Sequence, residues 1–600
     1  MQAGSISLCM IVKDEELVLE NCLASVNDLV TEIIIVDTGS TDKTKEIALK
    51  YGARIFDLPW ENDFSKARNH SLAHAGCEWI LLLDADEVLN ENDIPKFRAL
   101  MEDNNYDGYH FTILNYLQDN NTNDYATHYA FRFLRNTGTY EFRGNIHEQI
   151  EKIDGELDSS RFSLADITLY HFGYTSSIVK SKNKRERNMP LLKKALEDSP
   201  ENPFFLFNMG NEFMADNEYA YALDYYEKSY LYVNSDQAYT PHLYYRMILC
   251  YIELKNYTKA LGLVYQALIL YPECTDIEYC KAIIYHKTYS HFLAVKSLNK
   301  CIEMGDPPMN LKFLNDCATN RSFALLGEIY YIQGDYENAL LMYQLLYEKT
   351  NIPELLYKIA PLLNLLYEDK NQVDVVLRQY LPLYNGHDII YIIKLLLKEK
   401  LLVQAANRLK ELEKYKEYEA EYIYLYAKLN LYEGNYKKTK RLINLLFSMD
   451  LSNTALGDLY PLCLILSYLA HLFMRKNIDT SFLNKFNKLE SNQSLYTFRL
   501  LFSQIENREL YDLISVKENE LDMDLIMQII EEILLTGKIN FLKGTISSPV
   551  PFSDQNMCLR LAKLYMKYEY KELAIAAIVH SIKEFSLLDS ECAFYLSRNL

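Results

Sequence analysis

Three clusters of acidic residues follow predicted strands in the first ninety residues of the chain. They are Asp14-Glu15-Glu16 after Ile6–Val12, Asp37 after Glu32–Val36, and Asp84-Ala85-Asp86-Glu87 after Trp79–Leu83. Ligands of an open parallel sheet bind beyond the carboxyl ends of its strands, so we expect these clusters to lie together. Two aspartates one residue apart can hold a divalent cation, which neutralises a bound diphosphate. The alternative for Asp84 and Asp86 is a strand-terminal turn with helix-capping acids.

Alternating strands and helices must position these acids. Apolar periodicity predicts strands at Ile6–Val12, Glu32–Val36, Arg54–Phe56 and Trp79–Leu83, with helices at Glu15–Asn27, Thr41–Tyr51 and Phe64–Ala75 between them. Less regularly connected strands follow at Tyr109–Leu117, Tyr129–Leu134 and Ile167–Tyr174. Helical crossovers between strands imply parallel pairing with helices on both faces. We therefore predict a Rossmann-like α/β domain over residues 1–190, with a mixed, mainly parallel sheet.

Beyond residue 200 the strand pattern gives way to a helical repeat. A tetratricopeptide pattern that starts at Pro203 places small and large residues in their usual positions, namely Leu206, Gly210, Phe213, Ala222 and Tyr226. The pattern starts again at Pro241, Thr275 and Asn320. Small residues let paired helices approach while aromatic residues fill the space beside them. We predict an all-α solenoid, with tetratricopeptide repeats over residues 191–350 and degenerate helical repeats over residues 351–600.

Composition excludes several classes of protein. Of 600 residues, 49% are hydrophobic and 24% charged, which is ordinary for a globular chain and excludes a disordered one. The 82 acidic residues against 62 basic ones argue against a nucleic-acid partner, which needs a basic surface. The eleven cysteines are scattered, as reduced thiols are, and the longest apolar segment, Leu459–Met474, is shorter than the roughly 20 residues of a membrane span. We expect a cytoplasmic protein without a membrane span.

Four motifs in order give the chain a family resemblance. They are the segments Met10–Glu16, Val36–Asp42, Trp60–Asn69 and Leu83–Glu87. Together they resemble the family-2 glycosyltransferases of the GT-A fold, closely over residues 5–190. The chain looks most like the bacterial branch that carries tetratricopeptide repeats, which includes peptide S-glycosyltransferases that modify glycopeptide bacteriocins.

The resemblance implies roles for the residues of these motifs. Asp37 would bind the uracil ring and Arg68 would lie beside the base, while Lys13 and Glu15 belong to the same nucleotide-sugar site. Asp84 would face the ribose or the metal, and Asp86 would bind Mn²⁺ or Mg²⁺. Three alternatives stay open at this point: Asp37 as a cap of the turn at Gly39, Arg68 as a surface arginine, and Asp63 as a helix cap or as a support for Arg68.

Further members of the site are implied later in the chain. After the loop at Gly144, Glu148 would act as the base, although His147 beside it suits that role or metal binding as well. His171 would complete the metal site, with a buried core histidine as the alternative. The basic residues between 180 and 187 form either a lid over the pyrophosphate or a solvated helix face.

The resemblance predicts inverting transfer of a hexosyl or N-acetylhexosaminyl group from a nucleotide sugar, with UDP as the expected nucleotide. Concave helical arrays usually hold polypeptides, so we expect a peptide or protein acceptor, modified on Cys or on Ser/Thr. A homodimer is a further expectation. Two other hypotheses are a glycosyltransferase of cell-surface polysaccharide, whose repeats recruit partner enzymes, and a repeat scaffold without catalytic activity.

Overall fold

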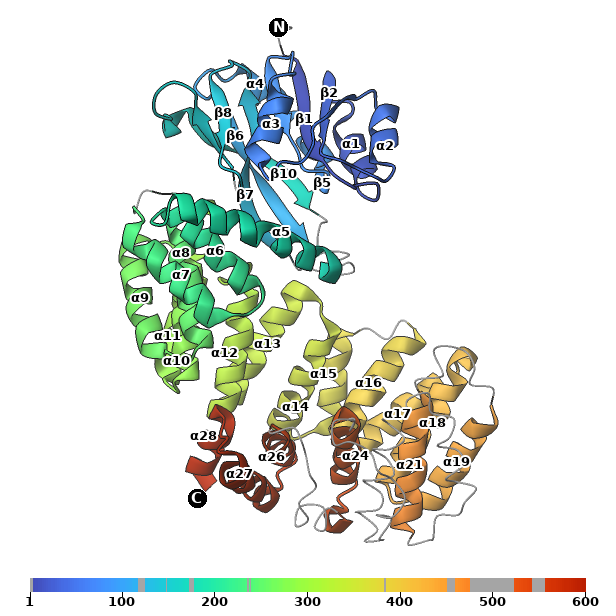
Figure 1. The fold of residues 1–600 in the computed structure, drawn as a ribbon. Helices are drawn as coiled ribbons and strands as arrows, with labels where there is room; N and C mark the ends of the chain where they lie inside the picture. Colours follow the sequence, from blue (N-terminus) through green and yellow to red (C-terminus); the bar gives the residue numbers. More distant parts are fainter. Residues whose placement is uncertain are drawn as a thin grey trace, which may run out of the picture. The chain divides into compact units, whose positions relative to one another are not determined.

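The computed structural model describes residues 4–116, 125–146, 148–171, 177–234, 237, 239–381, 385–449, 459–474, 523–541 and 556–599. The chain forms two compact units, Met1–Ser322 and Phe323–Leu600 (Figure 1). The first unit contains an α/β domain and a set of paired helices, and the second is helical throughout its described part.

The sheet of the α/β domain positions the acidic clusters. Its described strands follow the order β3-β2-β1-β4-β7-β6-β10-β5. Their bounds are β1 Ile6–Val12, β2 Glu32–Asp37, β3 Arg54–Asp57, β4 Trp79–Leu82, β5 Glu87–Leu89, β6 Gly108–Tyr116, β7 Tyr125–Arg135 and β10 Phe162–His171. The strands β3, β2, β1 and β4 are parallel, β7 is antiparallel to both β4 and β6, β10 is parallel to β6, and β5 is antiparallel to β10. The predicted mixed sheet is therefore confirmed.

Helices cover both faces of this sheet because successive strand residues point to opposite sides. In β1, Leu8 and Met10 pack in one core with α1 (Leu19–Val26), α2 (Thr44–Lys50) and α4 (Lys96–Glu102). Cys9 points the other way, and its thiol donates to the Ser71 carbonyl at 3.6 Å on α3 (Phe64–Leu72). The hairpin β8 (Tyr140–Arg143) and β9 (Gln149–Lys152) contributes to this second core through Phe142 and Ile150.

Paired helices complete the first unit. They are α5 Ser177–Asp198, α6 Pro203–Ala215, α7 Tyr219–Tyr232, α8 Thr240–Glu253, α9 Tyr257–Leu270, α10 Thr275–Lys287 and α11 His291–Met304 (Figure 1). The predicted repeat starts at Pro203 and Thr275 are the first residues of α6 and α10, and Pro241 is the second residue of α8. A Cβ on Gly210 would lie 2.4 Å from the ring of the fully buried Tyr226, so α6 and α7 approach as closely as the repeat pattern requires.

The same packing continues in the second unit. Its helices are α12 Asn320–Gln333, α13 Tyr336–Thr350, α14 Leu356–Leu366, α15 Lys370–Tyr380, α16 Gly386–Lys398, α17 Leu402–Leu412, α18 Glu419–Tyr432, α19 Tyr436–Ser448, α21 Leu459–Phe473, α24 Met523–Leu535, α26 Met557–Lys567, α27 Lys571–Phe585 and α28 Ser590–Asn599. A Cβ on Gly327 would lie 2.9 Å from the Tyr343 ring, as in the first repeat. No helix in the described part of the chain is both long and apolar enough to cross a bilayer. All eleven cysteines are buried free thiols.

Candidate active site

A cavity of about 450 Å³ lies at the carboxyl ends of β1 and β4. Among the predicted site residues that the structure describes, all but Asp37 line it, namely Lys13, Glu15, Arg68, Asp84, Asp86, Glu148 and His171. Arg68 comes from α3, Glu148 from the segment before β9, and His171 from the end of β10. Residues far apart in the sequence therefore meet at the sheet edge where ligands of such folds bind.

Two arginines hold the Asp84 carboxylate. The Arg68 guanidinium lies 3.0 Å from Oδ1, and the Arg132 guanidinium, which β7 supplies, lies 2.9 Å from Oδ2. Arg132 also makes two hydrogen bonds, of 2.7 and 3.0 Å, to the carboxylate of Glu87, which is only 2% exposed. The Glu87 carboxylate in turn accepts a 3.0 Å hydrogen bond from the Asp84 backbone N–H. The turn that carries Asp84 and Asp86 is thus fixed from both of its ends.

These contacts determine the charge states around Asp84. Desolvation alone would raise the pKa of Asp84, but the guanidiniums of Arg132 and Arg68 hold it well below its usual range. Burial raises the pKa of Glu87 even though Arg132 favours its ionised form. Asp84 is therefore a fixed anion of the site, whereas Glu87 depends on its arginine to stay charged.

Arg68 also binds Glu148, through a bond from Nε to Oε1. Both side chains are about nine-tenths buried. The Phe64 backbone N–H, at the start of α3, donates to the Asn145 carbonyl at 3.0 Å and so ties the segment before Glu148 to the helix of Arg68. Arg68 therefore links α3, the acidic turn after β4 and the predicted base.

Asp86 and His171 face each other across the cavity edge. The Asp86 Oδ2 and His171 Nε2 atoms are 3.1 Å apart, and the two side chains are 17% and 15% exposed. The antiparallel pairing of β5 with β10 sets this distance, since His171 lies opposite Glu87 in the register. Neighbouring ligands of an octahedral ion with bonds of about 2.1 Å are about 3 Å apart, so the pair fits two ligands of one divalent cation.

Other ligands would have to come from the substrate or from water. No group of three or more His, Cys, Asp or Glu side chains in the described ranges forms a complete metal site. Mg²⁺ ordinarily takes one or two carboxylates together with substrate phosphates and waters. The donor set of Asp86 and His171 therefore fits a cation that is bound together with a diphosphate.

A family model for glycosyl transferase family 2 matches residues 7–158, which span this sheet and most of the site. The N-terminal domain belongs to glycosyltransferase family 2. Over 302 residues the chain is 30% identical to the SPbeta prophage-derived glycosyltransferase SunS of Bacillus subtilis. This alignment covers 47% of the present chain and 66% of SunS. Over 212 residues it is 32% identical to a TPR repeat-containing protein of Synechococcus elongatus, covering 34% of this chain and 52% of that protein.

The chain thus spans between half and two thirds of the length of these two relatives. Among solved structures, it is similar to glucosyl-3-phosphoglycerate synthase from Mycobacterium tuberculosis in complex with Mn²⁺ and UDP-glucose. That match has 23% identity and a TM-score of 0.16, and it covers 19% of this chain and 43% of the other.

Two predicted residues of the glycosyltransferase domain have local structural partners. The Asp37 carboxylate is 1% exposed and accepts hydrogen bonds from the backbone N–H groups of Gly39 (3.1 Å) and Ser40 (3.0 Å). Burial opposes its ionisation, but these bonds and Lys45 keep its pKa below the usual value. Asp37 thus closes the turn that places Thr38 in the cavity, and its contact with uracil stays a prediction. Asp63 caps α3 by accepting from the Lys66 N–H at 2.9 Å.

Other predictions lie outside the described residues. His147 is one of these, and the side chains between positions 180 and 187 are likewise not described, although the backbone there belongs to α5. Sequence reasoning missed Arg132 and Asn188 as parts of the site, and it gave no role to Glu87 and Trp60, although both belong to the predicted motifs. A signal for Arg132 existed, since it is a single charge within Ala130-Phe131-Arg132-Phe133-Leu134, where a buried cation needs an acidic partner.

Proposed function

We propose that the protein is a metal-dependent, inverting glycosyltransferase that moves a sugar from a UDP-linked donor to a polypeptide. The observation that carries this proposal is the meeting of Asp86, His171 and Glu148 in one cavity of a family-2 domain. Asp86 and His171 are the residues that would hold Mn²⁺ or Mg²⁺, which supplies positive charge to the leaving diphosphate. Lys13 lines the same cavity and adds a cation for the donor.

In this reaction the acceptor attacks the anomeric carbon as the bond to the diphosphate breaks. Glu148 takes the proton of the attacking group, and the nucleoside diphosphate leaves with the electron pair. Arg68 positions Glu148 by binding Oε1, and no described residue bonds to Oε2, which is therefore the oxygen that accepts the proton. Asp84, fixed by two arginines, is assigned to the ribose side of the site.

The helices of the first unit support a polypeptide acceptor. Asn188 of α5 lines the cavity, and Leu191, Leu192 and Met209 of α5 and α6 pack against Ile146 beside Glu148. A segment held by the repeats would therefore reach the site at high effective concentration. The buried free thiols fit a reducing compartment, so we assign the reaction to the cytoplasm. The homodimer and the domain boundaries at 190 and 350 stay predictions.

The test is hydrolysis and binding of a panel of UDP- and GDP-sugars by the full chain with Mn²⁺, with Mg²⁺ or with EDTA. We expect turnover of a UDP-sugar that EDTA abolishes and that Asp86→Ala reduces at least a hundredfold. Asp524→Ala is the matched control, because Asp524 ends another Asp-x-Asp sequence but is 81% exposed in the second unit. Binding of no sugar nucleotide by the parent protein would overturn the proposal.

A further inference from the structure

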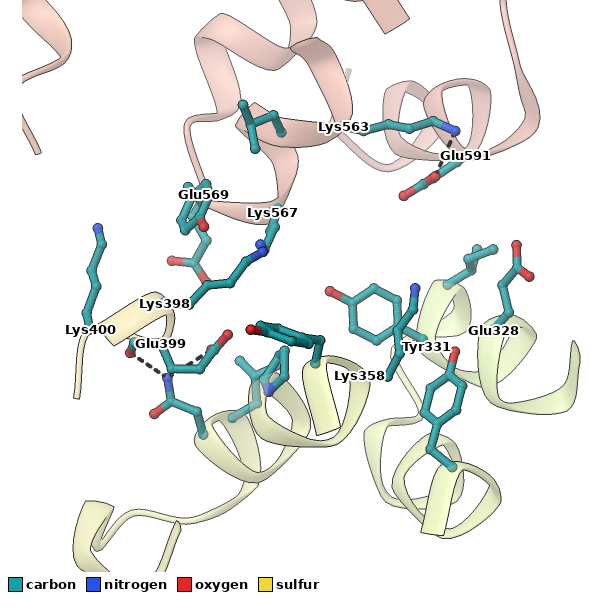
Figure 2. A pocket seen from close by; sticks show the side chains of 18 of the residues that line it. Glu328, Tyr331, Lys358, Lys398, Glu399, Lys400, Lys563, Lys567, Glu569 and Glu591 are labelled. Atoms are coloured by element: carbon teal, nitrogen blue, oxygen red, sulfur yellow. Dashed lines mark hydrogen bonds and ion pairs between the residues drawn. The ribbon is translucent and has the colours of Figure 1, made fainter. Parts of the chain in front are cut away.

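Lysines and acids pair along the walls of a cavity of about 740 Å³ in the second unit. Lys563 binds Glu591 at 3.2 Å (Figure 2), and Lys567 binds Glu531 at 3.0 Å. These pairs satisfy their own charges, so they require no ligand. The glycosyltransferase cavity differs, because one of its lining residues is a tryptophan, Trp60.

The two tryptophans of the chain have opposite surroundings. Trp79 on β4 is fully buried and stacks on the ring of Phe133, with the ring centroids 4.7 Å apart. Trp60 lies in the segment between β3 and α3, is half-buried and lines the cavity. A half-buried tryptophan at a cavity wall presents a large, rigid aromatic surface to a molecule that enters.

The backbone places Trp60 near the carboxyl end of β2. The Leu58 N–H donates to the Asp37 carbonyl at 2.9 Å, so the segment that carries Trp60 starts beside the last residue of β2. Thr38, which follows β2, lines the same cavity. Because β1 lies between β2 and β4, this end of the cavity is the one away from Asp86.

Two contacts hold the indole of Trp60. Its Nε1–H donates to Oδ1 of Asn62 at 3.0 Å, and the Phe64 ring meets it edge-on, with centroids 4.7 Å apart and planes at 67°. Asn62 has a φ of 60°, a left-handed conformation that asparagine tolerates better than most residues. Since the indole N–H is already donated, Trp60 offers a ligand its ring surface and no hydrogen bond.

The spacing of the strands matches a nucleotide that extends from the metal ligands to Trp60. Neighbouring strands lie about 4.8 Å apart, so the ends of β2 and β4 are about 10 Å apart. A ribose and the inner phosphate bridge a gap of this size. With the outer phosphate at Asp86 and His171, the base therefore reaches Thr38 and Trp60, while the sugar on the outer phosphate lies at the opposite end.

We propose that Trp60 is the platform on which the nucleobase of the donor stacks, an inference that rests on the proposed function. A base is planar and has a π-face, which is the group that an indole without a free N–H can bind. Trp60 thereby contributes to donor affinity by a contact that the diphosphate and the metal do not make.

Tryptophan emission and calorimetry of the full chain test this proposal. UDP is added to protein already saturated with Mn²⁺, so that the effect of the metal itself is part of the baseline. We expect UDP to quench the emission with the same Kd that calorimetry gives, because Trp79 is buried away from the cavity. Trp60→Leu should abolish the quenching and weaken UDP binding about tenfold.

Pyrophosphate separates stacking from a structural role of Trp60. It has no base, so its affinity in the presence of Mn²⁺ should be equal in Trp60→Leu and the parent protein, and Trp60→Phe should restore most of the UDP affinity. Tyr221→Leu is the matched control, since Tyr221 is 64% exposed on α7 outside the cavity, and it should change neither affinity.

Three results would overturn the proposal. One is UDP binding without quenching, and another is an equal loss of UDP and pyrophosphate affinity in Trp60→Leu. The third is unchanged UDP affinity in Trp60→Leu with a raised KM for a peptide acceptor, which would place Trp60 on the acceptor side. In all three UDP still binds, whereas absence of UDP binding by calorimetry would refute the proposed function itself.

Discussion

Replacing Arg132 by Leu should expose how strongly the acidic turn depends on one buried guanidinium. Arg132 is 9% exposed and binds both Glu87 and Asp84. In the variant, Asp84 keeps Arg68 at 3.0 Å, but Glu87 loses its cation while remaining buried at 2% exposure. The perturbation therefore acts mainly on Glu87.

Breaking a buried ion pair by removing one partner typically costs about 3–5 kcal/mol of unfolding free energy. We expect a loss near the lower end, about 3 kcal/mol, because burial already raises the pKa of Glu87 and the variant limits the cost by protonating it. The folded-state pKa of Glu87 then lies above its unfolded value. At low pH the buried Glu87 is protonated and neutral, which limits the destabilisation of the variant. As the pH rises through the folded-state pKa of Glu87, the carboxyl ionises without a partner, so the loss of unfolding free energy should be larger at pH 8 than at pH 5.

The assay is urea unfolding at the two pH values, together with donor-hydrolysis kinetics. Arg98→Leu is the control, since Arg98 is 86% exposed in a surface pair with Glu102 and should cost no more than about 1 kcal/mol. Arg132→Leu combined with Glu87→Leu should recover part of the stability but not the turnover number, because the turn that carries Asp86 stays unsupported. Equal stability of Arg132→Leu and Arg98→Leu, or a loss independent of pH, would refute this reasoning.

Two further predictions concern the repeats and the acceptor. Gly210→Ala should destabilise the first unit by about 1–3 kcal/mol, because the new Cβ would lie 2.4 Å from the Tyr226 ring. Gly262→Ala in α9 is the control: its Cβ meets nothing within 4 Å, so it should stabilise the unit by up to about 1 kcal/mol. Urea unfolding measures both variants, and equal effects would contradict the packing argument. Glu148→Gln should reduce transfer to a serine peptide at least a hundredfold but transfer to a cysteine peptide much less, since a thiol is already partly ionised near neutral pH. Mass spectrometry of the two peptides decides this, and equal losses would show that ionisation of the acceptor does not matter.

The strands that carry the acids were predictable because each is a short apolar run with polar residues on both sides. Ile6–Val12 is such a run, and β1 has the same bounds. β5 was missed because it has only three residues, Glu87–Leu89, too few for a periodic signal. The β8–β9 hairpin was missed since most of its side chains are exposed or half-buried, and it lacks a clear alternation of apolar and polar residues.

The partners of the acids were harder to predict than the acids themselves. Asp84 and Asp86 come shortly after β4 in the sequence, so predicting that strand is enough to place them at the edge of the sheet. Arg132 reaches Asp84 only because β7 runs antiparallel to β4, with Phe133 opposite Leu81 in the register. A register between strands about fifty residues apart depends on tertiary packing, which local patterns do not contain.

The ion pairs support the proposed role of a metal in this domain. Its two buried guanidiniums, on Arg68 and Arg132, are bound to its own carboxylates on Asp84, Glu87 and Glu148, and three anions outnumber two cations. A diphosphate that enters this cavity meets excess negative charge in a chain that is itself at −20. Lys13 alone does not offset that repulsion. A divalent cation at Asp86 and His171 would reverse the balance, so we expect donor affinity, and not only turnover, to fall when the metal is removed.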